Sequence, residues 1–329
     1  MNRSRLVRLA IGIIMAVVGL VSYYSYRQVN PVTGEIQHIS LTQDQEVALG
    51  LQSAPKMADD FGGLDPDPEV QSDVESVGQR VVSRSAAGET PYQFHFRVLA
   101  DDETVNAFAL PGGPVFITRA LLNRLENEAQ LAGVLGHEVG HVVGRHSAEQ
   151  IATSQLAQTL VGAVGVAASG EQGGGQQAAY VAAFVAQMAQ LKYGRSDELQ
   201  ADSLGVQLMS EAGYDPRALI NVMDILARAS GGSLQPEFLS SHPDPGNREQ
   251  SILEAIGKRF PAGVPASLSL GREITLSSDG AVGFAFRSAS SSPPRRSPNL
   301  REESKVTPTL SRRGLWLVII PGQARKKLF

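Results

Sequence analysis

Apolar residues recur with a helical period over most of the chain. An uncharged apolar run extends from Leu9 to Tyr26. Thr42 and Gln45 then have the spacing of a capping box, which predicts a helix continuing to about Met57. We expect further helices wherever apolar positions repeat every three or four residues, over 70–81, 119–125, 127–150, 154–168, 176–192, 196–212 and 216–229.

A strand period is confined to one short region. Apolar residues alternate from Tyr92 to Val98, and two more short strands are expected at 105–110 and 115–118, around a Pro-Gly-Gly-Pro turn. A glycine run at 173–175 separates two of the Ala-rich helices. The pattern therefore predicts an α+β fold that is mainly helical and contains a small sheet.

The first apolar run is 18 residues long, which just reaches the length of a membrane-spanning helix. Three arginines precede it, and tyrosines at its end suit a membrane interface. A small-x-small cleavage site is present only inside the run, at 17–19, so an uncleaved anchor is favoured over a signal peptide. Positive charge before the span predicts a cytoplasmic N-terminus, with the rest of the chain in the bacterial periplasm or cell envelope.

Composition narrows the chemistry. The chain contains no cysteine, which excludes disulfides, thiol catalysis and iron–sulfur clusters, so any metal must be held by His, Asp or Glu. Residues 28–286 hold 31 of the 33 acidic residues, whereas 14 of the 29 Lys and Arg residues lie outside that segment. The acidic middle argues against nucleic acid as a partner.

A metal-binding motif lies in the helix expected over 127–150. His137, Glu138 and His141 form an HExxH sequence, in which residues four apart share one helical face. Both imidazoles can therefore bind one Zn²⁺, and Glu138 is placed as the general base for a water molecule.

The third ligand has two candidates. His146 follows the motif, but the spacing required for a histidine in this position falls on Ser147 instead, about 100° of helix rotation away. Glu198 lies on a later helix and can complete a His₂Glu site, while Asp202, one turn further, can accept the proton of a zinc ligand's free ring nitrogen. We therefore expect Glu198 to be the ligand.

These motifs resemble the gluzincin metallopeptidases of the HtpX and CAAX-prenyl-endopeptidase (Ste24p-like) family, most closely their BepA-like periplasmic members. The resemblance covers roughly residues 30–260 and includes the segments 106–113, 118–122, 137–146, 198–202 and 242–248. The multi-span membrane core and the helical-repeat domain of other members have no counterpart here. The resemblance implies one Zn²⁺ per chain, polypeptide substrates, and a role in envelope protein quality control.

The resemblance also implies roles for further residues. It makes Asn106, Ala107 and Phe108 a substrate-binding edge strand, where an extended peptide pairs by backbone hydrogen bonds. It places Arg248 beside the ligands and the loop of His242 next to the metal. An imidazole there has two possible roles, either to donate to the oxyanion or to occupy the open zinc position and hold the enzyme inactive.

The sequence thus predicts a zinc endopeptidase whose ligands are His137, His141 and Glu198, with Glu138 and His242 in catalysis. The alternative is a zinc-stabilised chaperone or binding module in which proteolysis is normally latched. The expected domains are an anchor or signal peptide over 1–27, a peptidase domain over 28–260, an extension over 261–286 and a basic, disordered tail over 287–329.

Overall fold

A computed structural model of the chain describes residues 3–168, 193–230, 238, 242, 246–276 and 282–285. The chain up to Arg287 forms one compact unit. The expected glycine linker at 173–175, the helix over 176–192 and the basic tail lie outside the described residues.

A small sheet forms where the sequence predicts strands. It consists of β3 (His95–Leu99), β4 (Ala107–Ala109) and β5 (Pro114–Thr118), in the order β3-β5-β4. β5 pairs parallel with β3 and antiparallel with β4. The turn between β4 and β5 requires glycine, because a Cβ on Gly113 would lie 2.3 Å from the carbonyl oxygen of Gln93.

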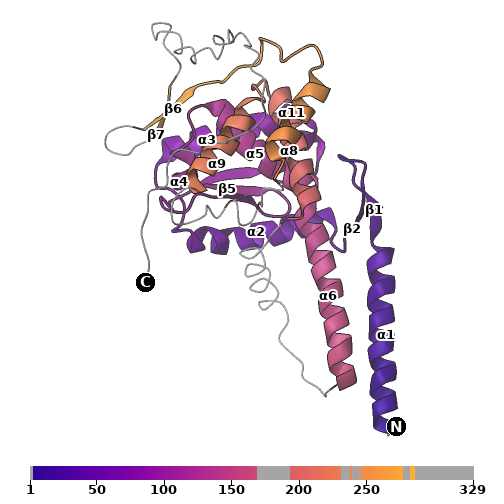
Figure 1. Cartoon of the computed structure of the whole chain (residues 1–329). Helices are drawn as coiled ribbons and strands as arrows, with labels where there is room; N and C mark the ends of the chain where they lie inside the picture. Colours follow the sequence, from indigo (N-terminus) through magenta and orange to yellow (C-terminus); the bar gives the residue numbers. More distant parts are fainter. Residues whose placement is uncertain are drawn as a thin grey trace, which may run out of the picture. The chain divides into compact units, whose positions relative to one another are not determined.

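The helix α5 (Glu128–Val143) runs through the core, and every residue in it is buried. Asn127 caps its first turn, because its side chain accepts a hydrogen bond from the backbone nitrogen of Gln130. Three helices pack against α5, namely α3 (Pro68–Ser83), α8 (Arg195–Glu211) and α9 (Ala218–Ser230). Figure 1 shows these helices above the sheet and α2 (Gln43–Asp60) below it. The histidines of the motif are therefore held on a fully packed element.

Small residues bring α5 and α8 into close contact. A Cβ on Gly140 would lie 3.0 Å from the carbonyl oxygen of Ala201, and one on Gly205 would lie 3.2 Å from the backbone nitrogen of His137. Side chains at these positions would separate the two backbones. The glycines thus allow Glu198 and Asp202 of α8 to reach the histidines of α5.

The expected single helix over 127–150 is wrong, because the chain turns between α5 and α6 (His146–Ala168). Arg145 lies at this turn with φ 59°, a left-handed conformation that is rare for a residue other than glycine. Its guanidinium is buried, pairs with Glu46 of α2 and donates to the carbonyl oxygen of Leu41 and the side chain of Gln28. These contacts stabilise the turn. The expected break between 150 and 154 is absent, since α6 continues through it.

Several elements were not predicted from the sequence. They include the helix that follows the His242 loop, two hairpins and one turn of 3₁₀ helix: α11 (Arg248–Arg259), β1 (Arg27–Val29) with β2 (Ile36–His38), β6 (Glu273–Leu276) with β7 (Val282–Ala285), and η1 (Ala86–Glu89). The helix expected over 119–125 is present as the shorter α4 (Arg119–Leu122). The β6–β7 hairpin contacts the start of α5 through an Arg272–Glu128 ion pair.

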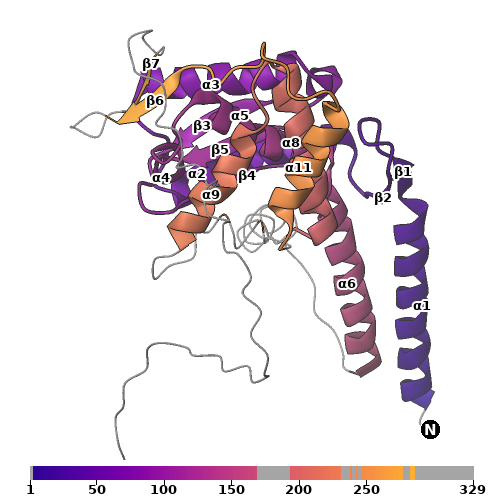
Figure 2. The same ribbon diagram turned by 45° about the horizontal axis from the view of Figure 1, so that its top comes forward.

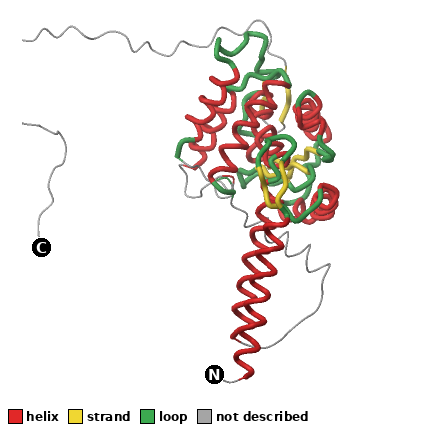
Figure 3. The backbone as a smooth tube through the Cα atoms, turned by 90° about the vertical axis from the view of Figure 1, so that its right-hand side faces the viewer, coloured by secondary structure: helices red, strands yellow, loops and turns green. Residues whose placement is uncertain are grey.

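The N-terminal helix α1 (Arg3–Ser25) lies beside α6. Figures 1 and 2 show the two helices side by side and antiparallel, and both extend beyond the sheet on the same side of the molecule. The tube in Figure 3 shows the same projection from the side. The segment Leu6–Ser25 of α1 is long and apolar enough to cross a membrane.

Candidate metal centre

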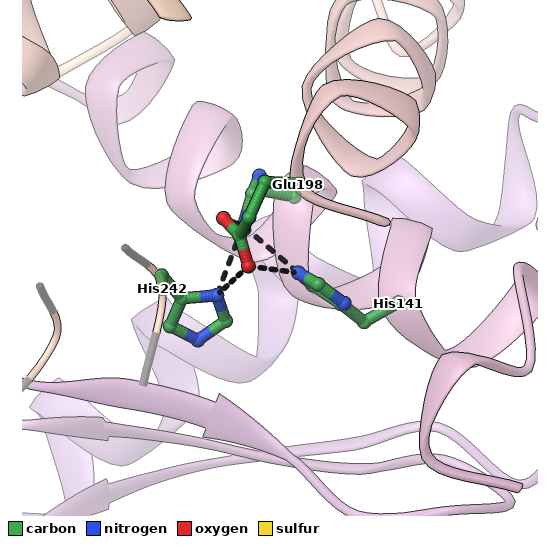
Figure 4. A group of neighbouring side chains, drawn as sticks. His141, Glu198 and His242 are labelled. Atoms are coloured by element: carbon green, nitrogen blue, oxygen red, sulfur yellow. Dashed lines mark hydrogen bonds and ion pairs between the residues drawn. The ribbon is translucent and has the colours of Figure 1, made fainter. Parts of the chain in front are cut away.

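Four side chains that can bind a metal converge at the centre of the molecule. His137 and His141 come from α5, Glu198 comes from α8, and His242 precedes α11. Their ligand atoms all lie within 4.8 Å of one another, and all four residues are buried. Figure 4 shows His141 and His242 on either side of the Glu198 carboxylate.

The interatomic distances show that one nitrogen of each histidine ring and the Glu198 carboxylate face a common point. Nε2 of His137 is 3.1 Å from Nε2 of His141 and 3.6 Å from a carboxylate oxygen of Glu198. Nε2 of His141 is 3.5 Å from the other Glu198 oxygen. His242 contributes Nδ1, at 3.0 Å from Glu198 and 3.3 Å from Nε2 of His137. The cluster thus contains the three ligands expected from the sequence and a fourth donor from His242.

The outer nitrogen of His137 contacts a charged pair. Nδ1 lies 3.0 Å from Asp202, which accepts two hydrogen bonds from Arg248 at 2.7 and 2.9 Å. Burial alone would raise the pKa of Asp202, but the hydrogen bonds from Arg248 and His137 outweigh it and lower this pKa to about 2. The carboxylate is therefore ionised and lies where it can accept the proton of His137 Nδ1.

The outer nitrogen of His141 contacts His146 instead. The two Nδ1 atoms are 2.9 Å apart, and Nε2 of His146 lies 2.8 Å from the side-chain oxygen of Gln200. Tyr193 stacks on His141 with ring centroids 3.9 Å apart and forms a hydroxyl hydrogen bond with Ser147. Tyr193 was not predicted from the sequence, because a single tyrosine before a helix belongs to no recognisable motif.

Glu138 lies beside the cluster, and its carboxylate has no hydrogen-bond donor among the described residues. Its carboxylate is fully buried, and neither oxygen accepts a hydrogen bond from the part of the chain that the structure describes. Nε2 of His242 is its near neighbour at 3.6 Å. Burial raises the pKa of the Glu138 carboxyl above its ordinary value, which increases its affinity for a proton.

The donor set fits a divalent cation. Buried ring nitrogens 3.1 and 3.3 Å apart, next to carboxylate oxygens that have no hydrogen-bond donor among the described residues, form an arrangement that a positive ion would satisfy. Imidazole and carboxylate ligands in the absence of thiolates are typical of Zn²⁺ in enzymes. His137, His141 and Glu198 supply three such ligands, and His242 can supply a fourth.

The expected substrate strand lies at an edge of the sheet. β4 has one neighbouring strand, β5, in the described part of the chain. Thr118 donates its hydroxyl to the carbonyl oxygen of Asn106, and the side-chain oxygen of Asn106 is buried without a donor among the described residues. The ring of Phe108 packs in the core against Phe61 and Phe116. The backbone N–H and carbonyl oxygen of Asn106 are both bonded to Thr118. Because bonded pairs alternate along an antiparallel ladder, Ala107 is the residue of 106–108 whose backbone faces the open edge of β4.

Comparison with known proteins supports a metal site at this position. The sequence model of Peptidase family M48 matches residues 68–256, which contain the four clustered side chains, Glu138, Asp202 and Arg248. The match covers more than half of the chain.

Similar proteins of curated description include two kinds of protease. The chain is 35% identical to the beta-barrel assembly-enhancing protease of Escherichia coli (strain K12), over 55% of this chain and 38% of that protein. It is 29% identical to the mitochondrial metalloendopeptidase OMA1 of Schizosaccharomyces pombe, over 72% of this chain and 68% of that protein. The metalloendopeptidase OMA1 of Bos taurus is 27% identical over 71% and 46%. The chain thus spans well under half of the Escherichia coli relative.

Proposed function

The chain belongs to peptidase family M48, and on that premise we propose that it is a zinc-dependent metalloendopeptidase that hydrolyses peptide bonds of polypeptides. The observation that carries the proposal is the buried cluster of His137, His141, Glu198 and His242, with the carboxylate of Glu138 beside it. His137, His141 and Glu198 are the proposed ligands of one Zn²⁺ per chain. The relatives named as proteases support the same activity.

The reaction requires a base and a positioned carbonyl group. A bound Zn²⁺ supplies Lewis-acid chemistry, which polarises the scissile carbonyl and acidifies water. Glu138 accepts the proton of the attacking water and passes it to the leaving amine, and its buried position strengthens it as a base. Asp202, held by Arg248, orients the ring of His137.

His242 has two proposed roles at different stages. With Nδ1 directed at Glu198 and His137, the ring can occupy a fourth ligand position in the resting enzyme. With a substrate present, an N–H of the same ring can donate to the developing oxyanion. We assign the donor role to the substrate complex and the latch to the resting state alone.

The proposed substrates are loose or unfolded polypeptides of the cell envelope. An edge strand recognises an extended peptide by backbone hydrogen bonds, which depend on shape more than on sequence. β4 has such an edge, and it is in contact with α5, the helix of His137 and His141. The proposed role in protein quality control of the envelope rests on the similarity to the beta-barrel assembly-enhancing protease. We further propose that α1 is an uncleaved anchor, which places the peptidase domain outside the cytoplasm.

A second candidate function is a latched binding module. The inward direction of His242 Nδ1 favours it, because a fourth protein ligand leaves no position for a substrate carbonyl.

Hydrolysis of casein by the full-length chain in detergent distinguishes the two. We expect cleavage that stops with chelator and returns with added zinc, and no cleavage by Glu138→Gln. A zinc-loaded wild-type chain that binds casein without cutting it would favour the module.

A further inference from the structure

α6 has an unusual combination of length and composition. It begins beside the metal centre, where Ile151 and Ala152 are buried, and continues for 23 residues, about 34 Å of helix. From residue 150 to residue 168 the sequence contains no charged side chain. Val161 lies in this part and is 73% exposed. A polar surface helix of this length ordinarily has charged residues on its solvent face.

α1 is the described partner of this part of α6. The two helices are in contact, and they approach closely at Gly19. A Cβ at Gly19 would lie 3.5 Å from Cβ and 2.8 Å from Cγ2 of Thr159. Glycine at a close crossing is the usual device by which helices pack in membranes. The contact also fixes the register, with Thr159 at the level of Gly19.

This register gives the depth of α6. The apolar segment Leu6–Ser25 has 20 residues, about 30 Å of helix, which equals the thickness of a bilayer's hydrocarbon core. Gly19 lies six residues inside the end of that segment, about 9 Å deep. Ala168 lies nine residues beyond Thr159 along α6, about 13 Å deeper. If α1 spans a membrane, the last three turns of α6 lie at the depth of the hydrocarbon.

We propose that the C-terminal half of α6 is inserted in the membrane beside α1, with hydrocarbon chains covering its exposed face. The uncharged sequence and the exposed valine suit this environment, and the helical backbone satisfies its own hydrogen bonds there. The inference rests on the proposed anchor role of α1. It does not depend on proteolysis.

Cysteine labelling tests the depth directly, because the chain has no cysteine of its own. Single substitutions Val161→Cys, Val18→Cys and Glu103→Cys place one thiol on α6, on α1 and on the exposed surface of the domain. Native membranes with the domain side outward are treated with a membrane-impermeant maleimide. We expect Val161→Cys and Val18→Cys to label at least about tenfold more slowly than Glu103→Cys, because hydrocarbon excludes the reagent. After denaturation all three should label equally.

A disulfide tests the register. The pair Gly19→Cys and Thr159→Cys should bridge on mild oxidation, since a Cβ separation of 3.5 Å lies within the disulfide range. Gly19→Cys with Thr153→Cys is the matched control and should keep both thiols, because Thr153 lies about 9 Å further along the helix.

The outcomes separate the two proposals. If Val161→Cys labels as fast as Glu103→Cys while Val18→Cys is protected, α6 lies outside the membrane and the inference is overturned, although the anchor stands. If Val18→Cys also labels fast, the anchor and the inference both fail. Casein cleavage by the same variants reports the proposed proteolysis independently.

Discussion

At the residue scale, each motif histidine uses its two ring nitrogens for different partners. Nε2 of both rings is directed into the cluster, whereas Nδ1 of His137 contacts Asp202 and Nδ1 of His141 contacts His146. One outer partner is a carboxylate paired with Arg248, and the other is an imidazole held by Gln200. Both outer contacts fix the ring orientation before a metal arrives.

Glu138→Gln is expected to retain zinc and lose hydrolysis. An amide of nearly the same shape cannot accept the proton of the attacking water, while the ligands stay intact. Zinc content by atomic emission and casein turnover measure the two properties. The exposed carboxylate Glu103 supplies the matched control, since Glu103→Gln should keep both. Cleavage by a zinc-loaded Glu138→Gln variant would remove the assigned base.

Glu198→Ala is expected to weaken zinc binding by more than about 100-fold. Loss of a residue that only orients a ligand costs 10–100-fold in affinity, and loss of a ligand should cost more. His146→Ala should remain within that smaller range, because His146 contacts the outer nitrogen of His141. Competition with a zinc chelator measures both. Equal affinities for wild type and Glu198→Ala would show that the third ligand is a different residue.

His242→Ala separates an oxyanion donor from a latch by the sign of its effect. Loss of a donor should lower kcat by about 10²–10³ with zinc content unchanged. Loss of a latch should raise the basal rate. We expect the lower kcat at saturating substrate, and unchanged rates for His95→Ala, whose side chain is exposed. If His242→Ala has the wild-type rate both at the basal level and at saturating substrate, His242 only shapes its loop.

Motif spacing in the sequence was sufficient to predict three members of the cluster, whereas His242 was placed beside them by the family resemblance. The HExxH pair follows from helix periodicity, and Glu198 with Asp202 follows from the next polar helix. Tyr193 and the contact between His141 and His146 depend on how α6 and α8 are placed in space. No local pattern encodes such a placement.

At the element scale, the α5–α8 contact depends on small side chains. Gly140 and Gly205 face the opposite backbone at distances that leave no room for a methyl group without a shift. Glu198 reaches the histidines because these glycines allow α5 and α8 to approach closely.

Gly140→Ala is expected to lower stability by about 1–3 kcal/mol and to weaken zinc binding. The new methyl group would lie 3.0 Å from the carbonyl oxygen of Ala201, so α8 must move away from α5. Gly257→Ala in α11 is the control, since nothing lies within 4 Å of its Cβ and alanine favours a helix by about 1 kcal/mol. Denaturant unfolding and zinc titration test both variants. Similar behaviour of the two variants would contradict the proposed importance of close packing.

Most helices and all three strands of the central sheet could be predicted from periodicity, whereas the break after Val143 could not. The sequence from residue 127 to 168 is continuously compatible with a helix, and the turn depends on Arg145 meeting Glu46 from α2. That contact joins residues 99 positions apart. The hairpin strands of three or four residues are likewise too short to show a period.

At the scale of the whole molecule, the N-terminal helix is in contact with the rest of the chain. α1 packs along α6, and α6 continues from the turn that ends the histidine helix. The position of α1 is therefore connected to the metal centre through α6.

The mature protein is expected to remain in the membrane fraction after a carbonate wash and to keep its arginine-containing start. The reason is the 20-residue apolar segment of α1, which has the length of a spanning helix. Intact-mass measurement of the membrane fraction identifies the N-terminus. A soluble form that begins near Ser22 would show that the segment is removed.

In the proposed membrane arrangement, the α5–α6 turn sets the height of the proposed peptidase site. The Gly19–Thr159 contact puts Thr153 at the level of Ser25, where the proposed anchor ends, and Arg145 lies eight residues above it, about 12 Å. An extended chain advances about 3.3 Å per residue, so about four residues cover that height. On these two proposals, a protein anchored in the same membrane would offer a bond at the height of the turn once about four unfolded residues emerge from its own span, whereas a folded domain that begins directly at the surface would offer none.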